Sequence, residues 1–284
     1  MAQLVKRRRY GKKINGTTEG PGHLKFTAQG NCVFTLKIAS SVKTSSLQSV
    51  SYSIDNGVTW VTTNNIDDTE VVITTPTITE GNSVLWKGSG LSMAQTMAFA
   101  NASYFSSTGI FAASGNVMSL LYGDDFEGKL TVRNYAFVSL FYNCTSLTSA
   151  PELPATTLAS YCYSGMFQNC SRLTQAPLLP ATTLASYCYN AMFYNCTSLT
   201  SAPELPATTL VSGCYKYMFS RCSSLRYVKA LFTTTPETSY TMAWLSGVAT
   251  SGTRKFVRST SATWQNSITR DANTVPSGWT IATS

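Results

Sequence analysis

The chain has 284 residues, of which 43% are hydrophobic and 12% are charged, and its formal net charge is +8. This length allows one large domain or two ordinary ones, and the hydrophobic fraction excludes a wholly disordered chain. No run of about 18 apolar residues occurs, so no transmembrane helix is expected. The basic N-terminus is not followed by an apolar segment, so we expect no signal peptide and no export.

The positive charge is concentrated at the two ends of the chain. Residues 1–13 carry a net charge of +6, residues 14–215 carry −4, and residues 216–284 carry +6. The middle of the chain is therefore mildly acidic, although the sequence pI is about 9.1. This distribution argues against a uniformly basic surface that binds nucleic acid along its whole length.

Residues 1–22 predict an extended basic arm, because they contain no pattern of apolar residues that could form a core. We expect the arm to anchor the protein to a partner. Two partners suit its charge, an acidic protein neighbour and the phosphates of a nucleic acid. The candidate anchoring residues are Lys6, Arg7, Arg8, Arg9, Lys12 and Lys13.

Residues 23–88 predict a small all-β domain of the sandwich type. Short runs such as HLKFTA, CVFTLKIA, EVVITT and SVLWKG are rich in β-branched and aromatic residues. Asn56-Gly57 lies between two such runs and is a strong hairpin signal. We expect Trp60 and Trp86 to form part of the core or a packing face of this domain, rather than a platform for a ligand.

A 26-residue repeat dominates the second half of the chain, with the unit MFxNCxSLTxAPxLPATTLxSxCYxxMF. We assign residues 89–134 to a degenerate lead-in, 135–232 to the repeats and 233–284 to a C-terminal cap. Two positions of the unit are occupied by cysteine, at Cys144, Cys170, Cys196 and Cys222, and at Cys162, Cys188 and Cys214. We expect them to be small buried residues rather than disulfides or metal ligands, because no histidine or carboxylate accompanies them.

Each unit predicts one helix and one short strand. Leu158, Cys162 and Met166 recur at a spacing that fits one apolar stripe of a helix, whereas the Pro-containing segment 173–179 favours a strand. One strand and one helix in about 20 to 29 residues is typical of leucine-rich repeats. We therefore predict an α/β leucine-rich-repeat solenoid, in which each unit buries its apolar face against its neighbours.

Several segments resemble a known family. MFYNCTSLTSAPELPATTL and YCYSGMFQNCSRLT resemble the BspA-type leucine-rich repeats of Bacteroidales proteins. NVMSLLYGDDF and the tail at residues 238–281 resemble the start and the end of such arrays, and YSIDNGVTW resembles the β domain that precedes them. The resemblance, over about residues 90–284, implies a surface-exposed interaction scaffold. Similar arrays also occur in tailed phages that infect these bacteria.

The sequence offers little material for catalysis. His23 is the single histidine and lies at the boundary of the arm, and a glycine-rich phosphate loop is missing. Two acidic clusters contain oxygen ligands suited to calcium, but neither has EF-hand spacing, and solvated loop acids are the expected interpretation. These clusters are Asp124, Asp125 and Glu127, and Asp67, Asp68 and Glu70. We expect no enzyme, no metal and no cofactor.

Tyr163, Tyr189 and Tyr215 form the candidate binding ladder. In the predicted helix they would lie about 140° from the row of Leu158, on the outer face of the solenoid. Exposed tyrosines suit contacts with a glycan or a protein, because they offer a large amphipathic area at a low cost in conformational entropy. The alternative is that they cover the joints between repeats or pack on a neighbouring element.

We expect a non-enzymatic structural or adhesive virion protein of a Bacteroidales tailed phage, attached to the capsid or tail as a decoration or head fibre and assembled in the host cytoplasm. Its arm would contact other virion proteins, and its repeats would face a host glycan or protein. An oligomer fits this role as well. The alternatives are a leucine-rich-repeat adhesin of the bacterial cell surface and a nucleic-acid-binding protein that acts through the arm.

Overall fold

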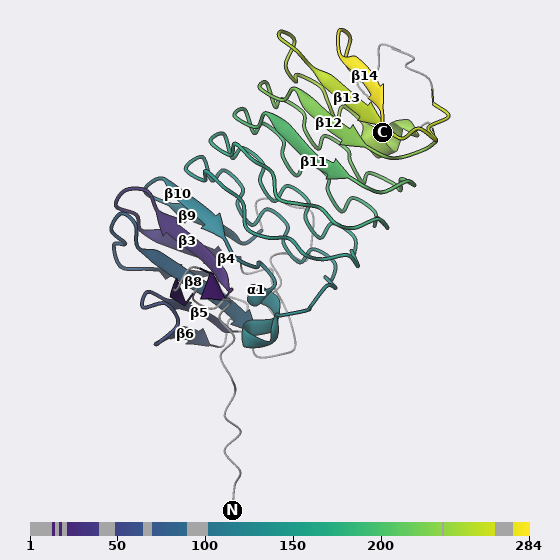
Figure 1. Cartoon of the computed structure of the whole chain (residues 1–284). Coiled ribbons are helices and arrows are strands. Elements are labelled where there is room, and N and C mark those ends of the chain that lie inside the picture. Colours follow the sequence, from purple (N-terminus) through teal and green to yellow (C-terminus); the bar gives the residue numbers. More distant parts are fainter. Residues whose placement is uncertain are drawn as a thin grey trace, which may run out of the picture.

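The computed structural model describes residues 13–14, 17–18, 22–39, 49–64, 70–89, 102–234, 236–264 and 275–284. The fold is mostly β-sheet, as the sequence predicts for its first part. Its α-helices, α1 (Ser119–Tyr122) and α2 (Thr238–Thr241), have four residues each, and η2 (Gly123–Asp125) is a short 3₁₀ helix. No helix in the described ranges is long and apolar enough to cross a membrane. A pair of sheets forms one end of the molecule, and stacked coils of chain extend from it (Figure 1).

Two antiparallel sheets enclose the N-terminal core. The first has the order β10 (Phe111–Ser114), β3 (Leu24–Ala28), β8 (Ser83–Ser89), β5 (Ser49–Ser53) and β6 (Val61–Asn64). The second has the order β7 (Val71–Thr74), β4 (Phe34–Ile38) and β9 (Tyr104–Ser107). Aromatic rings of the two sheets meet between them: the centroid of Phe26 lies 5.4 Å from Phe34, and that of Trp86 lies 4.9 Å from Phe105.

β9 and β10 belong to these sheets, although they fall in the segment 89–134 for which the sequence predicts a lead-in to the repeats. β10 pairs with β3, and β9 pairs with β4. The same segment also connects the sheets to the coils through backbone hydrogen bonds. The backbone N–H of Phe105 donates to the carbonyl of Leu140 at 2.8 Å, and that of Ala113 donates to Ser149 at 3.1 Å. The two parts therefore share one continuous core, which includes a contact between Phe26 and Phe141.

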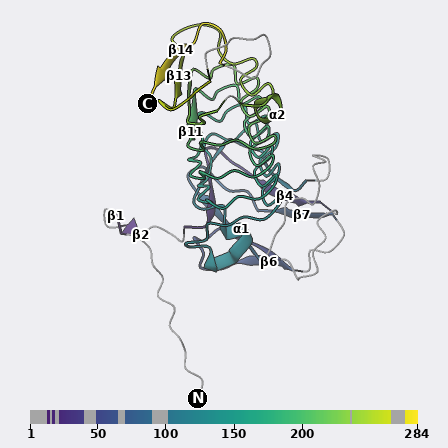
Figure 2. The ribbon, with the colours of Figure 1, turned by 90° about the vertical axis from the view of Figure 1, so that its right-hand side faces the viewer.

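Successive coils of the repeat region lie directly on one another. One wall of the stack carries a parallel sheet of β11 (Ser201–Leu205), β12 (Tyr227–Ala230), β13 (Lys255–Arg258) and β14 (Thr280–Thr283). Earlier coils continue this wall through single bridges, such as that between Ser149 and Gln175. Figure 2 shows β11 and β13 on this wall and α2 on the opposite one. We call these the sheet wall and the turn wall.

The turn wall contains a chain of tight turns where the sequence predicts a helix. In residues 161–169, the N–H groups of even-numbered residues bond the carbonyl three residues back, whereas those of odd-numbered residues bond a carbonyl of the next coil. Tyr161, Gly165 and Asn169 have positive φ angles of 59°, 61° and 63°, which a right-handed helix excludes. The helix prediction is therefore wrong. Leu158, Cys162 and Met166 are four residues apart, and four residues is also the period of these turns.

The interior of the stack consists of equivalent residues placed in columns. The cysteines of the repeat are buried and free of disulfides. Phe141, Phe167, Phe193 and Phe219 form a second column, whose neighbouring ring centroids are each 5.5 Å apart. Each column buries apolar surface at a constant spacing, so every coil depends on the coils above and below it for its core.

Candidate functional site

The predicted binding ladder is buried. Tyr163, Tyr189 and Tyr215 are each 1% exposed, so the prediction that they lie on the outer face is wrong. Their rings continue the interior column from Phe137 to Trp244, with centroid separations of 5.6 to 6.2 Å. The three rings lie inside the stack, each against the ring at the same position of the neighbouring coil.

The physical reason lies in the turns. A helix would place Tyr163 about 100° around its axis from Cys162, whereas the observed turn directs both side chains into the core. Burial raises the pKa of Tyr163 well above its ordinary value. These tyrosines therefore stabilise the stack and offer no surface to a partner.

A different row of tyrosines reaches the surface of the turn wall. Tyr135, Tyr161 and Tyr187 occupy one repeat position and are partly exposed. Their rings are stacked, with centroids 5.2 Å and 4.8 Å apart and planes inclined by 6° and 13°. Each of them has the same local geometry, because all three have a positive φ between 56° and 59°. We call these residues the surface tyrosine row.

The row ends where the fourth coil departs from the repeat. Gly213 stands where a further tyrosine would be, and a Cβ atom added there would lie 2.3 Å from the ring of Tyr187. Four residues later a large residue replaces a small one, because Tyr217 stands where the earlier coils have Gly165 and Ala191. The fourth coil therefore has a large ring where the second and third coils have small residues. Its hydroxyl donates a hydrogen bond to Met242 Sδ at 3.4 Å.

A groove of about 470 Å³ lies on the turn wall at these departures. Its lining residues are Tyr161 and Gln168 of one coil, Tyr187, Asn190, Ala191 and Tyr194 of the next, and Lys216 and Tyr217 of the third. Tyr217 takes the repeat position of Ala191 in the coil nearest the C-terminus. Three consecutive coils therefore contribute to one groove, which we call the tyrosine groove.

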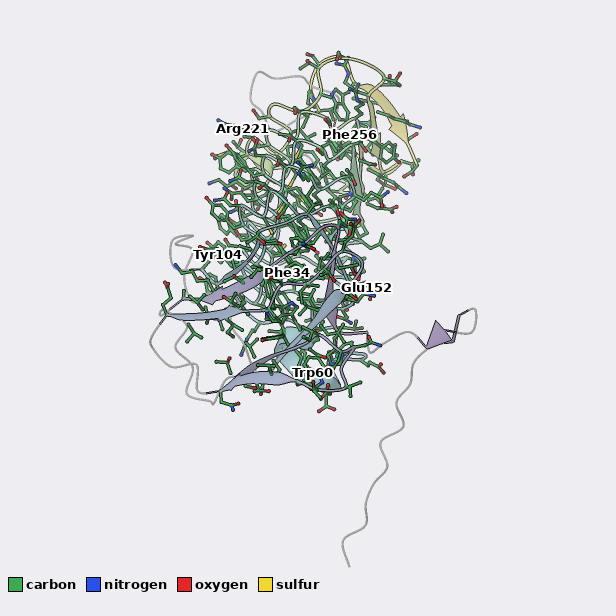
Figure 3. The ribbon with its side chains drawn as sticks, turned by 90° about the vertical axis from the view of Figure 1, so that its left-hand side faces the viewer. Phe34, Trp60, Tyr104, Glu152, Arg221 and Phe256 are labelled. Atoms are coloured by element: carbon green, nitrogen blue, oxygen red, sulfur yellow. The ribbon has the colours of Figure 1, made fainter. Side chains whose placement is uncertain are left out.

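Lys216 gives the tyrosine groove a positive charge in the coil of Tyr217. Lys216 lines the groove beside Asn190, and its Nζ lies 5.4 Å from the centroid of the Tyr217 ring. The guanidinium of Arg221 lies 5.5 Å from the centroid of the Tyr194 ring. None of the described residues that line the groove is acidic. Figure 3 shows Arg221 on the turn wall and Glu152 on the opposite side of the molecule.

The predicted anchoring residues of the arm lie almost wholly beyond the described residues. Lys6, Arg7, Arg8, Arg9 and Lys12 fall outside them. Lys13 begins β1 (Lys13–Ile14), a two-residue strand that pairs antiparallel with β2 (Thr17–Thr18). The structure therefore gives the arm a short local pairing and leaves its role in anchoring as a prediction.

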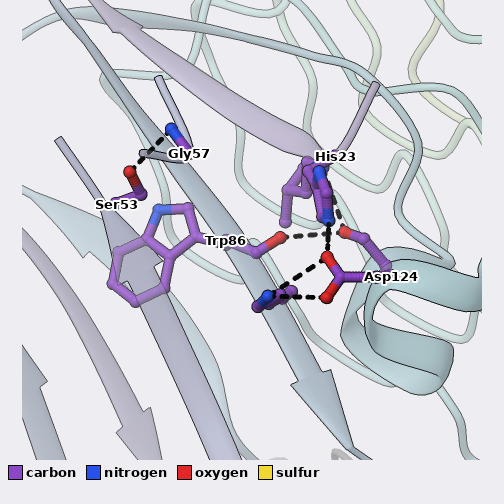
Figure 4. A network of polar contacts seen from close by, with 8 residues as sticks. His23, Ser53, Gly57, Trp86 and Asp124 are labelled. Atoms are coloured by element: carbon purple, nitrogen blue, oxygen red, sulfur yellow. Dashed lines mark hydrogen bonds and ion pairs between the residues drawn. The ribbon is translucent and has the colours of Figure 1, made fainter. Parts of the chain in front are cut away.

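His23 takes part in a polar network at the start of β3 (Figure 4). Its Nε2 lies 2.9 Å from Oδ1 of Asp124, and Nζ of Lys87 lies 2.8 Å from Oδ2 of the same carboxylate. Burial lowers the pKa of His23, although the hydrogen bond with Asp124 raises it. Ser119 donates to the carbonyl of Trp86 at 2.9 Å and so ties α1 to the same region. This network joins the arm boundary to β8 and η2.

The two acidic clusters are not assembled into a metal site within the described residues. Asp124 is paired with Lys87 and His23, and Glu70 is paired with Lys37 at 2.8 Å. Asp67 and Asp68 lie outside the described residues.

The two tryptophans of the β domain pack as the sequence predicts. Trp86 is fully buried between the two sheets. Trp60 is partly exposed and contacts the His23 ring at 5.2 Å between centroids, and Nζ of Lys87 lies 4.1 Å from its centroid. Both rings are therefore packing residues of the N-terminal part.

Comparison with known proteins gives no match among family models, curated proteins or solved structures. The function must therefore be inferred from the surface of this chain alone. The tyrosine groove is the feature with the strongest chemistry for binding, because it combines ring edges, amides and an ammonium group in a recess.

Sequence reasoning missed this groove because it selected the wrong tyrosine of the YCY motif. The assumed helical phase placed Tyr163 outside and left Tyr161 without a role. A signal was nevertheless present in the repeat. Gly213 and Tyr217 differ from the residues at the same repeat positions of the preceding coil, Tyr187 and Ala191.

Proposed function

We propose that this chain is a non-enzymatic binding scaffold of the leucine-rich-repeat type, in which the stacked coils form a solenoid. The 26-residue repeat of the sequence and the hydrogen bonds between successive coils support this assignment. The solenoid differs from the predicted α/β form, because its second wall consists of turns.

The tyrosine groove is the single observation that carries the binding role. The backbone that carries its side chains is held by the neighbouring coils, since the odd-numbered N–H groups of each turn bond the next coil. Tyr161 is stacked between the other two members of the surface tyrosine row. A recess built from side chains that are already ordered loses little conformational entropy when a ligand binds.

We assign this scaffold to a tailed-phage virion of Bacteroidales, where it would act as a structural and adhesive decoration or fibre component. The resemblance of the repeat to arrays found in such phages supports the assignment. The basic arm would attach it to other virion proteins. A bacterial surface adhesin would use the same groove without this attachment.

Deletion of residues 1–18 tests the attachment. The shortened chain should remain folded and soluble, because the described core begins at Leu24, and it should no longer join the assembled particle. Co-purification with particles, followed by mass spectrometry, measures the incorporation. The control is a chain in which a Gly/Ser segment of the same length replaces residues 1–18.

Incorporation of the shortened chain at the level of the intact chain would refute the anchoring role. Salt-sensitive binding of the intact chain to DNA, lost when the arm is removed, would instead favour a nucleic-acid-binding arm.

A further inference from the structure

We propose that the tyrosine groove binds an acidic oligosaccharide, with a carboxylate of the sugar paired to Lys216. This inference rests on the proposed binding role and names the ligand class of the same groove. It follows from the shape of the groove, from its hydrogen-bonding groups and from its charge.

The shape indicates a specific recess rather than a by-product of stacking. A strictly repeating array would give an open channel, since each coil would present the same side chain at each position. The exchange at Gly213 and Tyr217 interrupts this pattern, because it ends the surface tyrosine row and puts a large ring where the preceding coils have Gly165 and Ala191. Lys216 lines the groove from the same coil as Tyr217.

The hydrogen-bonding groups suit a ligand rich in hydroxyls. The phenol groups of Tyr161, Tyr187 and Tyr194 have no hydrogen bond to any part of the chain that the structure describes. Each phenol can both donate and accept a hydrogen bond, and the amide of Gln168 adds two donors and an acceptor. Because the faces of the Tyr161 ring are covered by its neighbours, ring edges and hydroxyls are what the row presents.

The spacing of the row also suits a sugar chain. The two rings of the row that line the groove, Tyr161 and Tyr187, have centroids 4.8 Å apart, which is close to the length of one pyranose unit in an extended polysaccharide. A peptide strand is a poorer fit, because the backbone of the groove has no unpaired edge. The N–H groups of Tyr187 and Ala191 already bond the carbonyls of Ser212 and Lys216 in the next coil.

The charge selects an acidic sugar. Within the described residues Lys216 forms no ion pair with a carboxylate. The guanidinium of Arg221 adds a second positive charge over the ring of Tyr194, which lines the groove. A carboxylate bound in the groove beside Tyr217 would form a charge-assisted hydrogen bond with the ammonium group of Lys216. The aromatic ring of Tyr217 beneath that group keeps it at the groove.

Calorimetry with defined tetrasaccharides tests the proposal on the intact chain. The acidic probes are tetragalacturonate, a hyaluronan tetrasaccharide and an α-2,8-linked sialic acid tetramer, and the neutral probe is carboxyl-reduced tetragalacturonate. At least one acidic probe should bind with a Kd below about 1 mM. Its affinity should fall at high salt, and the neutral probe should bind more weakly.

Two variants borrow residues from earlier coils of the repeat and should fold normally. Lys216→Asn copies Asn190 of the preceding coil, and it should lower the affinity for the acidic probe about tenfold while leaving the neutral probe unchanged. Tyr217→Gly copies Gly165 and removes a ring that lines the groove, so it should weaken the binding of both probes. Tyr227→Thr removes a tyrosine from the sheet wall and is the matched control, expected to bind as the wild type does.

Failure of all three acidic probes to bind would overturn the proposal, and so would an unchanged preference for acid in Lys216→Asn. The scaffold role is tested separately by adhesion of the intact chain to host cells. Adhesion that persists in Tyr217→Gly would overturn the groove inference and leave the scaffold role standing. Absence of adhesion and of incorporation into particles would overturn both.

Discussion

Buried thiols act as hydrogen-bond donors between coils. Sγ of Cys170, Cys196 and Cys222 lies 3.1, 3.0 and 3.0 Å from the carbonyl oxygens of Phe141, Phe167 and Phe193. Each of these carbonyls also accepts the N–H of the residue three positions later. Cysteine therefore satisfies a second lone pair of a buried carbonyl while it fills a small apolar space.

Replacement of Cys196 by alanine tests this role. Cys196→Ala removes the sulfur from a fully buried position and leaves both a cavity and a weakened carbonyl partner. We expect the free energy of unfolding to fall by about 1–3 kcal/mol, measured by chemical denaturation. Thr200→Ala, at an exposed position of the same coil, is the control and should change stability by less than about 0.5 kcal/mol. Equal stability of the two variants would contradict a packing role for the cysteine.

Burial of the cysteines could be predicted from the sequence, whereas the position of the tyrosines could not. A small residue without a charged companion is buried under almost any local geometry, so the cysteine prediction did not depend on the turn wall. The position of Tyr163 depended entirely on whether residues 158–166 form a helix. A spacing of four residues satisfies both a helix and a series of turns, so it cannot separate them.

At the scale of the element, asparagine marks the turns. Asn143, Asn169 and Asn195 have positive φ angles of 59°, 63° and 59°, a region that asparagine tolerates better than most residues. Their amides also form a ladder. Asn169 donates to Asn143 at 2.6 Å, and Asn195 donates to Asn169 at 3.0 Å. Gly165 has the same backbone conformation one turn earlier, so glycine and asparagine every four residues favour turns over a helix.

Two substitutions of Asn169 separate the backbone effect from the ladder. Asn169→Gly removes the amide ladder and keeps the backbone conformation, and it should lower the free energy of unfolding by about 1 kcal/mol. Asn169→Ala removes the amide ladder and also disfavours the positive φ, so it should lower the free energy of unfolding by about 1–2 kcal/mol more. Thermal unfolding of the two variants and the wild type measures the difference. A glycine variant that is as unstable as the alanine variant would show that the positive φ is not what asparagine provides here.

At the scale of the whole molecule, the N-terminal sheets and the stacked coils share one hydrophobic core. The rings of Phe26 and Phe105 in the N-terminal sheets contact Phe141 of the stack, so the aromatic column begins in the β domain. The sequence identified the strands of that domain through their β-branched and aromatic runs. It could not assign β9 and β10 to the same sheets, because their pairing with β4 and β3 joins segments distant in sequence. Local patterns carry no information about such pairs.

The columns of buried thiols give the whole molecule a dependence on alkaline pH. Burial raises the pKa of Cys162 and Cys222 from 9.0 to about 12, and that of Cys214 to about 11. A group whose pKa is higher in the folded state contributes its full stability below the unfolded value. That stability is lost as the pH rises toward the folded value, by about 1.4 kcal/mol per pH unit for each thiol.

The melting temperature should therefore stay constant up to about pH 9 and fall steeply between about pH 9 and 11, because several thiols deprotonate together on unfolding. Circular dichroism in the presence of a reducing agent measures it, and return to neutral pH should restore the original value. High salt is the control, since it screens surface charges but not the deprotonation of thiols exposed by unfolding. A melting temperature that is unchanged at pH 11 would contradict this role of the buried thiols, and a fall that high salt abolishes would show that surface charges control the alkaline stability.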